Sequence, residues 1–279
     1  MNSELKNIFS ELYSLSKYYL MEMPYIVGGV PRDYSIFGSA TIGGSSSGIS
    51  SRAVDLDMTT NSSDSMRLAI LFASRNDLRF RIFDDRHVTV FLKNFNVDFS
   101  SNYISKNVID FLKSEQCTEY LCPAFPEIEE KALEIYSRDF TINALHQNIR
   151  TGEIVDILDR SLKDIEDKKI TTILPPEITL LDDPRRVFRA IRFSTKFGFS
   201  IDEDIKQYVK NNKHILSSSS VKDGYISSEI SMSMKYNSDE TIKALKDMDI
   251  LGMIPMTGDF KEYIIKNKLV IDYLDSSIA

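Results

Sequence analysis

The sequence predicts an α+β protein in which a small mixed sheet with flanking helices is followed by a helical second half. The runs LRFRIF, VTVFL and FNVDF alternate in the manner of half-buried strands. The segment SSDSMRLAILFAS combines a capping residue with helical periodicity. From Glu127 onward the pattern is helical, apart from a hairpin expected around NIRTGEIVDI, so the architecture should change between residues 150 and 160.

The N-terminal part of the chain predicts a helix, a strand and a glycine turn. An amphipathic helix is expected to run to about residue 20. The run YIVGG then predicts a short buried strand that ends in two glycines. Residues 39–52 are rich in glycine and serine and have nothing to bury, so they are expected to form a mobile loop before VDLDM.

Composition limits the class of protein and its partners. A chain of 279 residues with 42% hydrophobic residues can form one large domain or two smaller ones. Its net charge of -7 argues against a uniformly basic surface, so a nucleic acid would have to be held by a local basic patch. The two cysteines, Cys117 and Cys122, do not form a disulfide framework or a zinc motif, which favours a reducing compartment.

Membrane and export signals are also absent from the sequence pattern. No apolar run approaches the length of a membrane span, and the N-terminal residues follow a helical pattern with acidic residues. A soluble cytoplasmic protein without a membrane partner is therefore expected, and a nuclear or mitochondrial pool is left open.

The triplet DLD places two carboxylates on one face of a predicted strand. Because side chains alternate along a strand, Asp55 and Asp57 point the same way while Leu56 points into the core. Two such anions repel unless a cation lies between them, and Mg²⁺ prefers hard oxygen ligands of this kind. A DxD triplet also occurs by chance on exposed strand edges, so the pair alone does not decide between the two interpretations.

Two further features strengthen the metal interpretation. Gly28 and Gly29 follow a predicted strand, where the backbone can approach a phosphate closely, and Arg32 could hold the same anion. Asp98 lies on a later predicted strand and could complete a carboxylate cluster, although a single acid on a strand is also commonly exposed or satisfied.

The motifs GGVPRD, DLD, SRDFTINAL and LLDDPRRVFRAIRFSTKFGF occur in this order between about residues 25 and 235. The ordered set resembles the class II tRNA nucleotidyltransferases (CCA-adding enzymes) and the related bacterial-type poly(A) polymerases. Both belong to the polymerase-β-like nucleotidyltransferase superfamily. The connecting segment LKDIEDKKITTILPPEITLLDDP most resembles the eukaryotic-type branch of this family.

The resemblance implies a catalytic role for three acids. Asp55 and Asp57 match the carboxylates that hold the catalytic metal ions, and Asp98 matches a third acid that helps deprotonate the RNA 3'-hydroxyl or hold the metal. Phosphoryl-type transfer depends mainly on positioning and charge neutralisation. Mg²⁺ is the cofactor that the resemblance implies.

The resemblance also implies nucleotide-binding residues in the first half. Gly28, Gly29 and Arg32 would contact the triphosphate. Arg138 and Asp139, at the start of an expected helix, match a motif that binds the nucleotide and senses the ribose 2'-hydroxyl. By residue pattern alone, the latter pair could equally be surface charges at a capped helix.

The resemblance also implies that the basic segment near residue 190 carries the residues that select the nucleotide. On a single helix, Asp183, Arg186, Arg189 and Arg192 would recur every three residues along one face. Asp183 and Arg186 match the EDxxR pattern that selects CTP and then ATP, with Asp182 in place of the glutamate. Arg189 and Arg192 would reach the triphosphate or brace this pair, although charged helices commonly carry such a solvated face.

Several positions depart from the family pattern. Ser137 stands where a second arginine is usual, Pro31 replaces an aliphatic residue, and Tyr225 occupies a usual arginine position. The loop over residues 39–52 is longer than the usual spacer. The sequence ends at residue 279, whereas typical members continue through helical body and tail domains, so a partner chain supplying these parts is one expectation.

Three domains and one activity are predicted on this basis. Residues 1–150 would form the catalytic polymerase-β-like nucleotidyltransferase head, 151–215 a helical neck with the nucleotide-selecting helix, and 216–279 a partial helical body that binds RNA. The predicted activity adds C, C and A to the tRNA 3' end from CTP and ATP. The alternatives are a poly(A)-type, CC-only or A-only polymerase, and a catalytically weakened RNA-binding subunit. Whether residues 103–127 form an active-site lid is left open.

Overall fold

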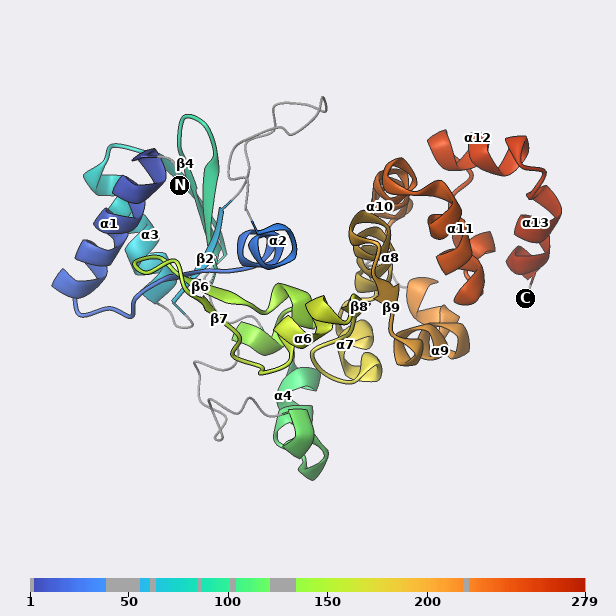
Figure 1. The fold of residues 1–279 in the computed structure, drawn as a ribbon, viewed down its shortest axis with the longest axis horizontal. Coiled ribbons are helices and arrows are strands. Elements are labelled where there is room, and N and C mark those ends of the chain that lie inside the picture. Colours follow the sequence, from blue (N-terminus) through green and yellow to red (C-terminus); the bar gives the residue numbers. More distant parts are fainter. Residues whose placement is uncertain are drawn as a thin grey trace. The chain divides into compact units, whose positions relative to one another are not determined.

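The computed structural model describes residues 3–38, 56–60, 64–84, 87–100, 104–120, 134–217 and 221–278. The chain divides into two compact units between Ile165 and Glu166 (Figure 1). The first unit contains a seven-stranded mixed sheet with helices, and the second is mainly helical. The predicted α+β fold class is therefore confirmed.

The first unit contains the sheet and the helices around it. Its helices are α1 (Ser3–Tyr18), α2 (Gly29–Phe37), α3 (Asp64–Arg75), α4 (Lys106–Leu112) and α6 (Ser161–Glu166), with 3-10 turns at Glu115–Tyr120 and Thr141–Asn143. Its strands are β1 (Tyr25–Ile26), β2 (Leu56–Thr59), β3 (Arg79–Asp84), β4 (His87–Phe91), β5 (Asn96–Ser100), β6 (His146–Asn148) and β7 (Ile154–Val155).

The strands of this sheet follow the order β3-β4-β5-β2-β1-β6-β7. Strands β2 and β5 run parallel, and the other neighbouring pairs in the described sheet are antiparallel. The parallel pair lies at the centre of the order, between the β3–β5 meander and the strands β1, β6 and β7. This topology brings residues near 57 beside residues near 98.

One face of the sheet forms the core of the first unit. Helix α3 packs on β4 and β5, and α1 packs on α3 (Figure 1). Alternate strand residues point into this core because the side-chain period of a strand is two. The residues buried in this way are Leu56, Met58, Val88, Val90, Val97 and Phe99. The residues between them, including Asp57 and Asp98, therefore belong to the opposite face.

Most predicted elements of the first unit are present. The N-terminal helix, the YIVGG strand, the helix after residue 60, the strands β4 and β5 and the hairpin β6–β7 confirm the sequence pattern. Strand β3 differs, because all six of its residues are exposed rather than half-buried. Its position at the end of the strand order leaves it one neighbour, which accounts for the exposure.

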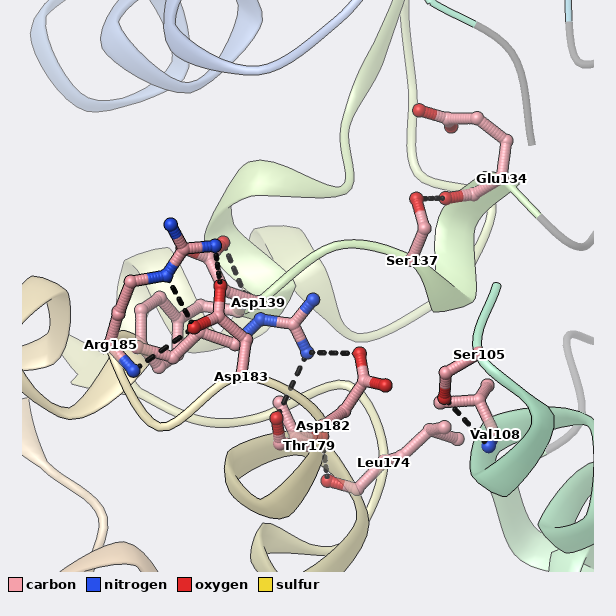
Figure 2. A network of polar contacts seen from close by, with 12 residues as sticks. Ser105, Val108, Glu134, Ser137, Asp139, Leu174, Thr179, Asp182, Asp183 and Arg185 are labelled. Atoms are coloured by element: carbon pink, nitrogen blue, oxygen red, sulfur yellow. Dashed lines mark hydrogen bonds and ion pairs between the residues drawn. The ribbon is translucent and has the colours of Figure 1, made fainter. Parts of the chain in front are cut away.

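Two expected loops have different outcomes. The glycine- and serine-rich loop predicted over residues 39–52 lies outside the described residues. Residues 104–120, within the segment considered as a lid, contain helix α4 and a 3-10 turn. Helix α4 is capped by Ser105, whose Oγ accepts a hydrogen bond from the Val108 N–H at 3.3 Å (Figure 2).

The second unit is a set of helices with a small sheet. Its helices are α7 (Pro176–Asp182), α8 (Arg186–Phe197), α9 (Glu203–Asn211), α10 (Asp223–Tyr236), α11 (Ser238–Asp247), α12 (Gly258–Lys266) and α13 (Val270–Ile278). Turns of 3-10 helix cover Lys213–Ser217 and Leu251–Met253, and the parallel strands β8 (Lys169–Ile170) and β9 (Ser200–Ile201) pair with each other. Helix α8 packs against α10 and α11 through its apolar face.

Asp183 does not lie on the same helix as Arg186, which corrects the helix placement expected from sequence. Helix α7 ends at Asp182, Asp183 has an extended backbone, and α8 begins at Arg186. Pro184 explains the break, because proline lacks an N–H and disfavours helical geometry in the residue before it. The regular three-residue spacing therefore holds along α8 only from Arg186 onward.

The boundary between the units falls later than residue 150. Strand β7 pairs with β6 and so adds residues 154–155 to the sheet of the first unit. The second unit, Glu166–Ala279, is not divided further, so residues 166–215 and 216–279 share one compact body. In the described part of the chain, no helix is both long enough and apolar enough to span a membrane.

Candidate active site

Two acids stand side by side on the face of the sheet opposite the core. Asp57 on β2 pairs in register with Asp98 on β5, and the two strands are parallel. Asp57 is exposed and Asp98 is half-buried, whereas Leu56 beside Asp57 is fully buried, as the alternation predicted. Asp55, the other acid of the DLD triplet, lies outside the described residues. The sheet thus brings two of the three predicted acids together.

Asp98 is held in place by residues of the neighbouring strand. Thr89, which lies opposite Asp98 on β4, donates a short hydrogen bond from Oγ1 to Asp98 Oδ1. His87 Nε2 lies 3.4 Å from the same oxygen. These contacts could not be predicted from local sequence patterns, because they depend on the register between β4 and β5.

Gly28 allows the backbone to pass close to Asp57. Its φ angle of 71° lies in the region that favours glycine, and a Cβ added to it would lie 2.8 Å from Asp57 Oδ2. The Val27 N–H also donates to the Asp57 carbonyl oxygen at 3.0 Å. A side chain at position 28 would therefore displace the Asp57 carboxylate.

Helix α2 begins directly after this turn, at Gly29. Pro31 lies in the first helical turn, where its missing N–H has no intrahelical partner to lose. Arg32 is buried, with 6% of its surface exposed. Its Nε donates to Asp33 Oδ1 and its Nη1 to Asn143 Oδ1, both at 2.7 Å. Arg32 thus anchors α2 to the segment that follows Arg138.

Arg138 is the basic group beside the glycine turn. Its Nη1 would lie 3.6 Å from a Cβ on Gly28. Its Nη2 donates a short hydrogen bond to Glu134 Oε1, and its Nη1 donates to the Asn143 carbonyl oxygen at 3.3 Å. Burial by itself would lower the pKa of the guanidinium, but Glu134, and then Asp57 and Asp139, raise that pKa above its ordinary value. Arg138 is therefore a permanently charged group near Asp57.

The RDFTINAL motif forms a tight turn rather than the start of a long helix. Thr141–Asn143 is a 3-10 turn, and strand β6 follows it. Asp139 is buried, and its Oδ1 accepts hydrogen bonds from the Phe140 N–H at 2.8 Å and from Asn143 Nδ2 at 2.7 Å. Asp139 therefore positions Asn143, which in turn binds Arg32.

Glu134 and His146 lie beside Arg138 and were not among the site residues predicted from sequence. Glu134 is 3% exposed and lies four residues before Arg138, a spacing that favours an ion pair. Its carbonyl oxygen accepts a hydrogen bond from Ser137 Oγ at 2.6 Å (Figure 2). His146 is fully buried, its Nε2 lies 3.8 Å from Glu134 Oε2, and burial lowers the pKa of its imidazole. The imidazole is accordingly neutral at pH 7.

The carboxylates present fit a divalent cation only in part. Among the described residues, no group of three His, Cys, Asp or Glu side chains is placed to hold a metal ion. Asp57 and Asp98 nevertheless offer hard oxygen donors on adjacent strands, which is the chemistry that Mg²⁺ prefers. Asp55, two residues before Asp57, belongs to the undescribed part of the chain.

In the second unit, Asp183 binds Arg185 (Figure 2). Asp183 Oδ1 accepts from Arg185 Nε at 2.8 Å and from the Arg185 N–H at 3.1 Å, and Oδ2 accepts from Nη2 at 2.9 Å. These hydrogen bonds raise the pKa of the Arg185 guanidinium. The guanidinium also lies 5.7 Å from the centre of the Tyr225 ring. Arg185 had not been singled out from the sequence.

Arg186, the arginine of the EDxxR pattern, makes different contacts. Its Nη1 donates to the Thr179 carbonyl oxygen at 3.0 Å and lies 3.6 Å from Asp182 Oδ2. Only 11% of its side chain is exposed, so it joins α8 to the end of α7. The structure therefore pairs Asp183 with Arg185, and Arg186 with Asp182.

The two remaining predicted arginines lie on α8. Arg189 stacks over Phe193, with 5.4 Å between the guanidinium carbon and the ring centre. Arg192 Nε donates to Glu229 Oε2 at 2.6 Å, which joins α8 to the buried Glu229 of α10. Tyr225 on α10 has its pKa raised to about 12, mainly by burial and then by Glu229, while Arg189 acts in the opposite direction.

The first unit, which carries the paired acids and the glycine turn, and the helical second unit match the fold of a CCA-adding enzyme head and neck. A solved structure described as a CCA-adding enzyme with ATP superposes with a TM-score of 0.65 at 20% sequence identity, over 90% of this chain and 53% of that one. The family model for the poly A polymerase head domain matches residues 24–171. The chain belongs to this family, which includes the class II CCA-adding enzymes.

Curated relatives are similar over shorter segments. The mitochondrial CCA tRNA nucleotidyltransferase of Saccharomyces cerevisiae is 44% identical over 104 residues, which is 35% of this chain and 18% of the yeast protein. A tRNA nucleotidyltransferase of Schizosaccharomyces pombe is 30% identical over 164 residues, which is 50% of this chain and 33% of that protein. The matched part of the chain thus spans a third or less of each relative.

Proposed function

We propose that this protein transfers nucleotides to the 3' end of RNA and that its physiological reaction is addition of C, C and A to tRNA from CTP and ATP. The observation that carries the proposal is the register of Asp57 with Asp98 beside the Gly28 turn. Paired carboxylates next to a turn that can receive phosphates suit phosphoryl-type transfer. The names of the relatives, which are tRNA nucleotidyltransferases, support tRNA as the acceptor.

A divalent metal, Mg²⁺ in this proposal, would be held by Asp57 together with Asp55, and Asp98 would assist. When bound, it would neutralise charge on the triphosphate and favour ionisation of the RNA 3'-hydroxyl. The repulsion between the two neighbouring carboxylates is offset in part by Arg138, which interacts with Asp57, and a bound cation would offset it further.

The remaining residues of the first unit would bind and orient the triphosphate. Gly28 and Gly29 have no side chains, so the N–H groups at the start of α2 would be open to a phosphate. Arg138 would add positive charge near the same position. Arg32 and Asp139 are both buried in contacts with Asn143, so they would act by fixing the loop that carries Arg138.

The second unit would select the base. Asp183 and Arg186 are proposed to recognise the incoming nucleotide, with Arg189 and Arg192 as supporting residues. Asp183 is already bound by Arg185 on two sides, so Arg185 is added to this set as the residue that orients its carboxylate. A carboxylate acceptor beside guanidinium donors matches the polar edges of cytosine and adenine.

Two other activities remain candidates for the same site. A poly(A)-type polymerase is one candidate, because the family whose head-domain model matches the chain includes the poly A polymerases. A CC-only or A-only enzyme would use the same residues with a different stopping point. A catalytically weakened RNA-binding subunit, with a partner chain that supplies further RNA contacts, is the alternative from another class.

The test is an incorporation assay with three RNAs. Purified protein and Mg²⁺ are incubated with tRNA that lacks CCA, tRNA that ends in CC, and an unstructured oligonucleotide, each with labelled CTP or ATP. Addition that stops after C, C and A supports the proposal, whereas long A-tracts on any RNA indicate a poly(A)-type enzyme. Asp57→Ala should abolish incorporation with an unchanged circular dichroism spectrum. Full activity of that variant would overturn the catalytic assignment.

A further inference from the structure

The face of the sheet that carries Asp57 and Asp98 continues without interruption to its outer edge. The register aligns Asp57 with Asp98, Asp98 with Thr89, and Thr89 with Arg81. Residues that pair directly across neighbouring strands point to the same face. A single row of side chains therefore runs from the paired acids to the exposed strand β3.

Around Arg81 this face carries cationic and aromatic side chains in contact with one another. The Arg81 guanidinium carbon lies 4.6 Å from the centre of the Phe83 ring, and the Phe83 ring stacks on His87 with 4.9 Å between ring centres and an interplanar angle of 18°. Arg79 lies 6.0 Å from the ring centre of Phe91, its partner across the strand pair. These five residues, Arg79, Arg81, Phe83, His87 and Phe91, are called the β3–β4 stripe.

Arg79, Arg81 and Phe83 of the β3–β4 stripe are exposed, His87 and Phe91 are half-buried, and none of the five belongs to the core of the first unit. Every residue of β3 is exposed, with Phe83 at 50%, whereas the core of the first unit lies on the other face of the sheet. The Phe83 ring contacts the Arg81 guanidinium and the His87 ring, and half of its surface remains accessible to a ligand. Charged residues on an edge strand also oppose pairing with another strand, which disfavours a second protein chain as the ligand.

The chemistry of the stripe fits single-stranded RNA. Aromatic rings provide stacking surfaces for bases of any sequence, and arginines bind phosphates. Asp84, opposite His87, adds one negative charge at the hairpin end, so the positive charge is concentrated at Arg79 and Arg81. This is a local basic patch of the kind that a chain with a net charge of -7 requires to hold a nucleic acid.

We infer that the β3–β4 stripe binds the single-stranded 3' segment of the acceptor RNA, with Phe83 stacking on a base and Arg81 binding a phosphate. The His87 ring joins the stripe to the catalytic face, because it stacks on Phe83 and lies 3.4 Å from Asp98. RNA held along this row would lead toward Asp98 and Asp57. The inference rests on the proposed function and names further residues that bind its RNA substrate.

The test measures RNA binding without nucleotide, so that it does not depend on catalysis. The probe is a fluorescein-labelled RNA minihelix with a single-stranded 3' end, and the full chain is titrated by fluorescence anisotropy. Phe83→Ala and Arg81→Gln should each raise Kd about tenfold, since one stacked base contributes on this scale. Phe83→Tyr retains a ring and should keep the wild-type Kd. Arg81→Gln should also reduce the slope of log Kd against log salt by about one.

Two matched variants control for aromatic and charge content. Phe80→Ala changes an exposed phenylalanine of β3 on the opposite face, and Arg67→Gln changes an arginine of α3 whose side chain is 63% exposed. Both should leave Kd within about twofold of wild type, and circular dichroism confirms folding of each variant. Equal Kd values for stripe and control variants, or no RNA binding by the wild-type chain, would overturn the inference.

The incorporation assay separates this result from the proposed function. If the wild-type chain adds nucleotides and the stripe variants keep its KM for RNA, the stripe inference fails and the proposed function stands. If the chain binds RNA through the stripe but adds no nucleotide, the stripe inference stands and the proposed function fails. A change in self-association of Phe83→Ala, measured by sedimentation without any change in RNA affinity, would instead assign the stripe to contact between copies and overturn the inference.

Discussion

Asp57 and Asp98 occupy matching positions on the parallel strands β2 and β5, so two carboxylates stand one strand apart on the same face. Neighbouring strands are about 4.8 Å apart, and at this distance like charges repel. The Asp98 carboxylate is fixed by Thr89, whereas Asp57 is exposed beside the Gly28 turn. Arg138 offsets part of this repulsion, and the two carboxylates on one face still attract cations.

The first prediction concerns the charge of Asp57. Asp57→Asn removes both the repulsion by Asp98 and the attraction by Arg138, so the free energy of unfolding without metal should change by less than about 0.5 kcal/mol. The substitution should also lower incorporation by about 10²–10³-fold or more, because a preorganised charge is lost. Urea unfolding with and without Mg²⁺ measures the first effect: Mg²⁺ should stabilise the wild type more than the variant.

Asp110→Asn is the control for this experiment, because Asp110 is an exposed acid on α4 away from the pair. It should leave the response to Mg²⁺ unchanged. Equal stabilisation of wild type and Asp57→Asn by Mg²⁺ would show that Asp57 does not bind the metal.

Gly28→Ala is the second prediction. The backbone at position 28 has a φ angle of 71°, and the added Cβ would lie 2.8 Å from Asp57 Oδ2. Backbone strain of this kind costs about 1–3 kcal/mol, and displacement of Asp57 should lower kcat as well. Gly224→Ala, in helix α10 with open space around the position, should be neutral or slightly stabilising. Thermal unfolding of both variants tests the difference, and an unchanged Gly28→Ala protein would contradict it.

The third prediction concerns the buried pair of Glu134 and Arg138. Their side chains are 4% and 14% exposed, so Glu134→Ala would leave a buried guanidinium without its main partner. The expected loss is about 3–5 kcal/mol of unfolding free energy. Glu240→Ala, which removes an exposed ion pair with Lys243, should cost less than about 1 kcal/mol. If the double variant Glu134→Ala/Arg138→Ala is as unstable as the sum of the single variants, the two residues are not coupled.

Local patterns predicted most of the elements and two local features of the candidate site. Alternation predicted that Leu56 is buried and Asp57 is not, and the glycines at 28 and 29 predicted the strand-to-helix turn. The seven-stranded order was not predicted, because register between distant strands depends on side-chain packing over the whole sheet. The contacts of Asp98 with Thr89 and His87 follow from that register and were missed for the same reason.

The second unit shows how one residue can change a motif-based interpretation. Counting every third residue from Asp183 assumed a continuous helix, but Pro184 separates Asp183 from α8. The extended backbone at Asp183 turns its carboxylate toward Arg185. Proline was visible in the sequence, so the break could have been predicted from its missing N–H. The hydrogen bonds from Arg185 to both carboxylate oxygens of Asp183 could not be predicted, because they depend on the geometry of the turn.

The fourth prediction separates Arg185 from Arg186. Arg186 is mostly buried and donates to the Thr179 carbonyl oxygen, so Arg186→Ala should lower the unfolding free energy by about 1.5–3 kcal/mol. Arg185 is 47% exposed, so Arg185→Ala should cost less than about 1 kcal/mol. Arg185→Ala should instead raise the KM for CTP and ATP, because Asp183 loses the partner that orients it. Urea unfolding and steady-state kinetics give both values, and a stable Arg186→Ala protein would contradict the structural role.

The last prediction follows from the titration of Tyr225. Burial, and then Glu229, raise the pKa of its phenol to about 12, whereas an unfolded tyrosine titrates near about 10. Between these values the folded protein retains a proton that the unfolded chain has released. The free energy of unfolding must therefore fall as pH rises, and the contribution of Tyr225 is complete below pH ~10 and lost by pH ~12.

Tyr225→Phe should remove this part of the alkaline loss of stability, because phenylalanine has no phenol to ionise. The measurement is the difference in unfolding free energy between wild type and variant from pH ~9 to ~12, since lysines titrate in both proteins and cancel in the difference. Tyr34→Phe, which changes a tyrosine with 45% of its surface exposed, is the matched control for the loss of one phenol hydroxyl. A constant difference between wild type and Tyr225→Phe across this range would show that Tyr225 titrates alike in the folded and unfolded states, and so that the phenol beside Arg185 is not held protonated by its burial.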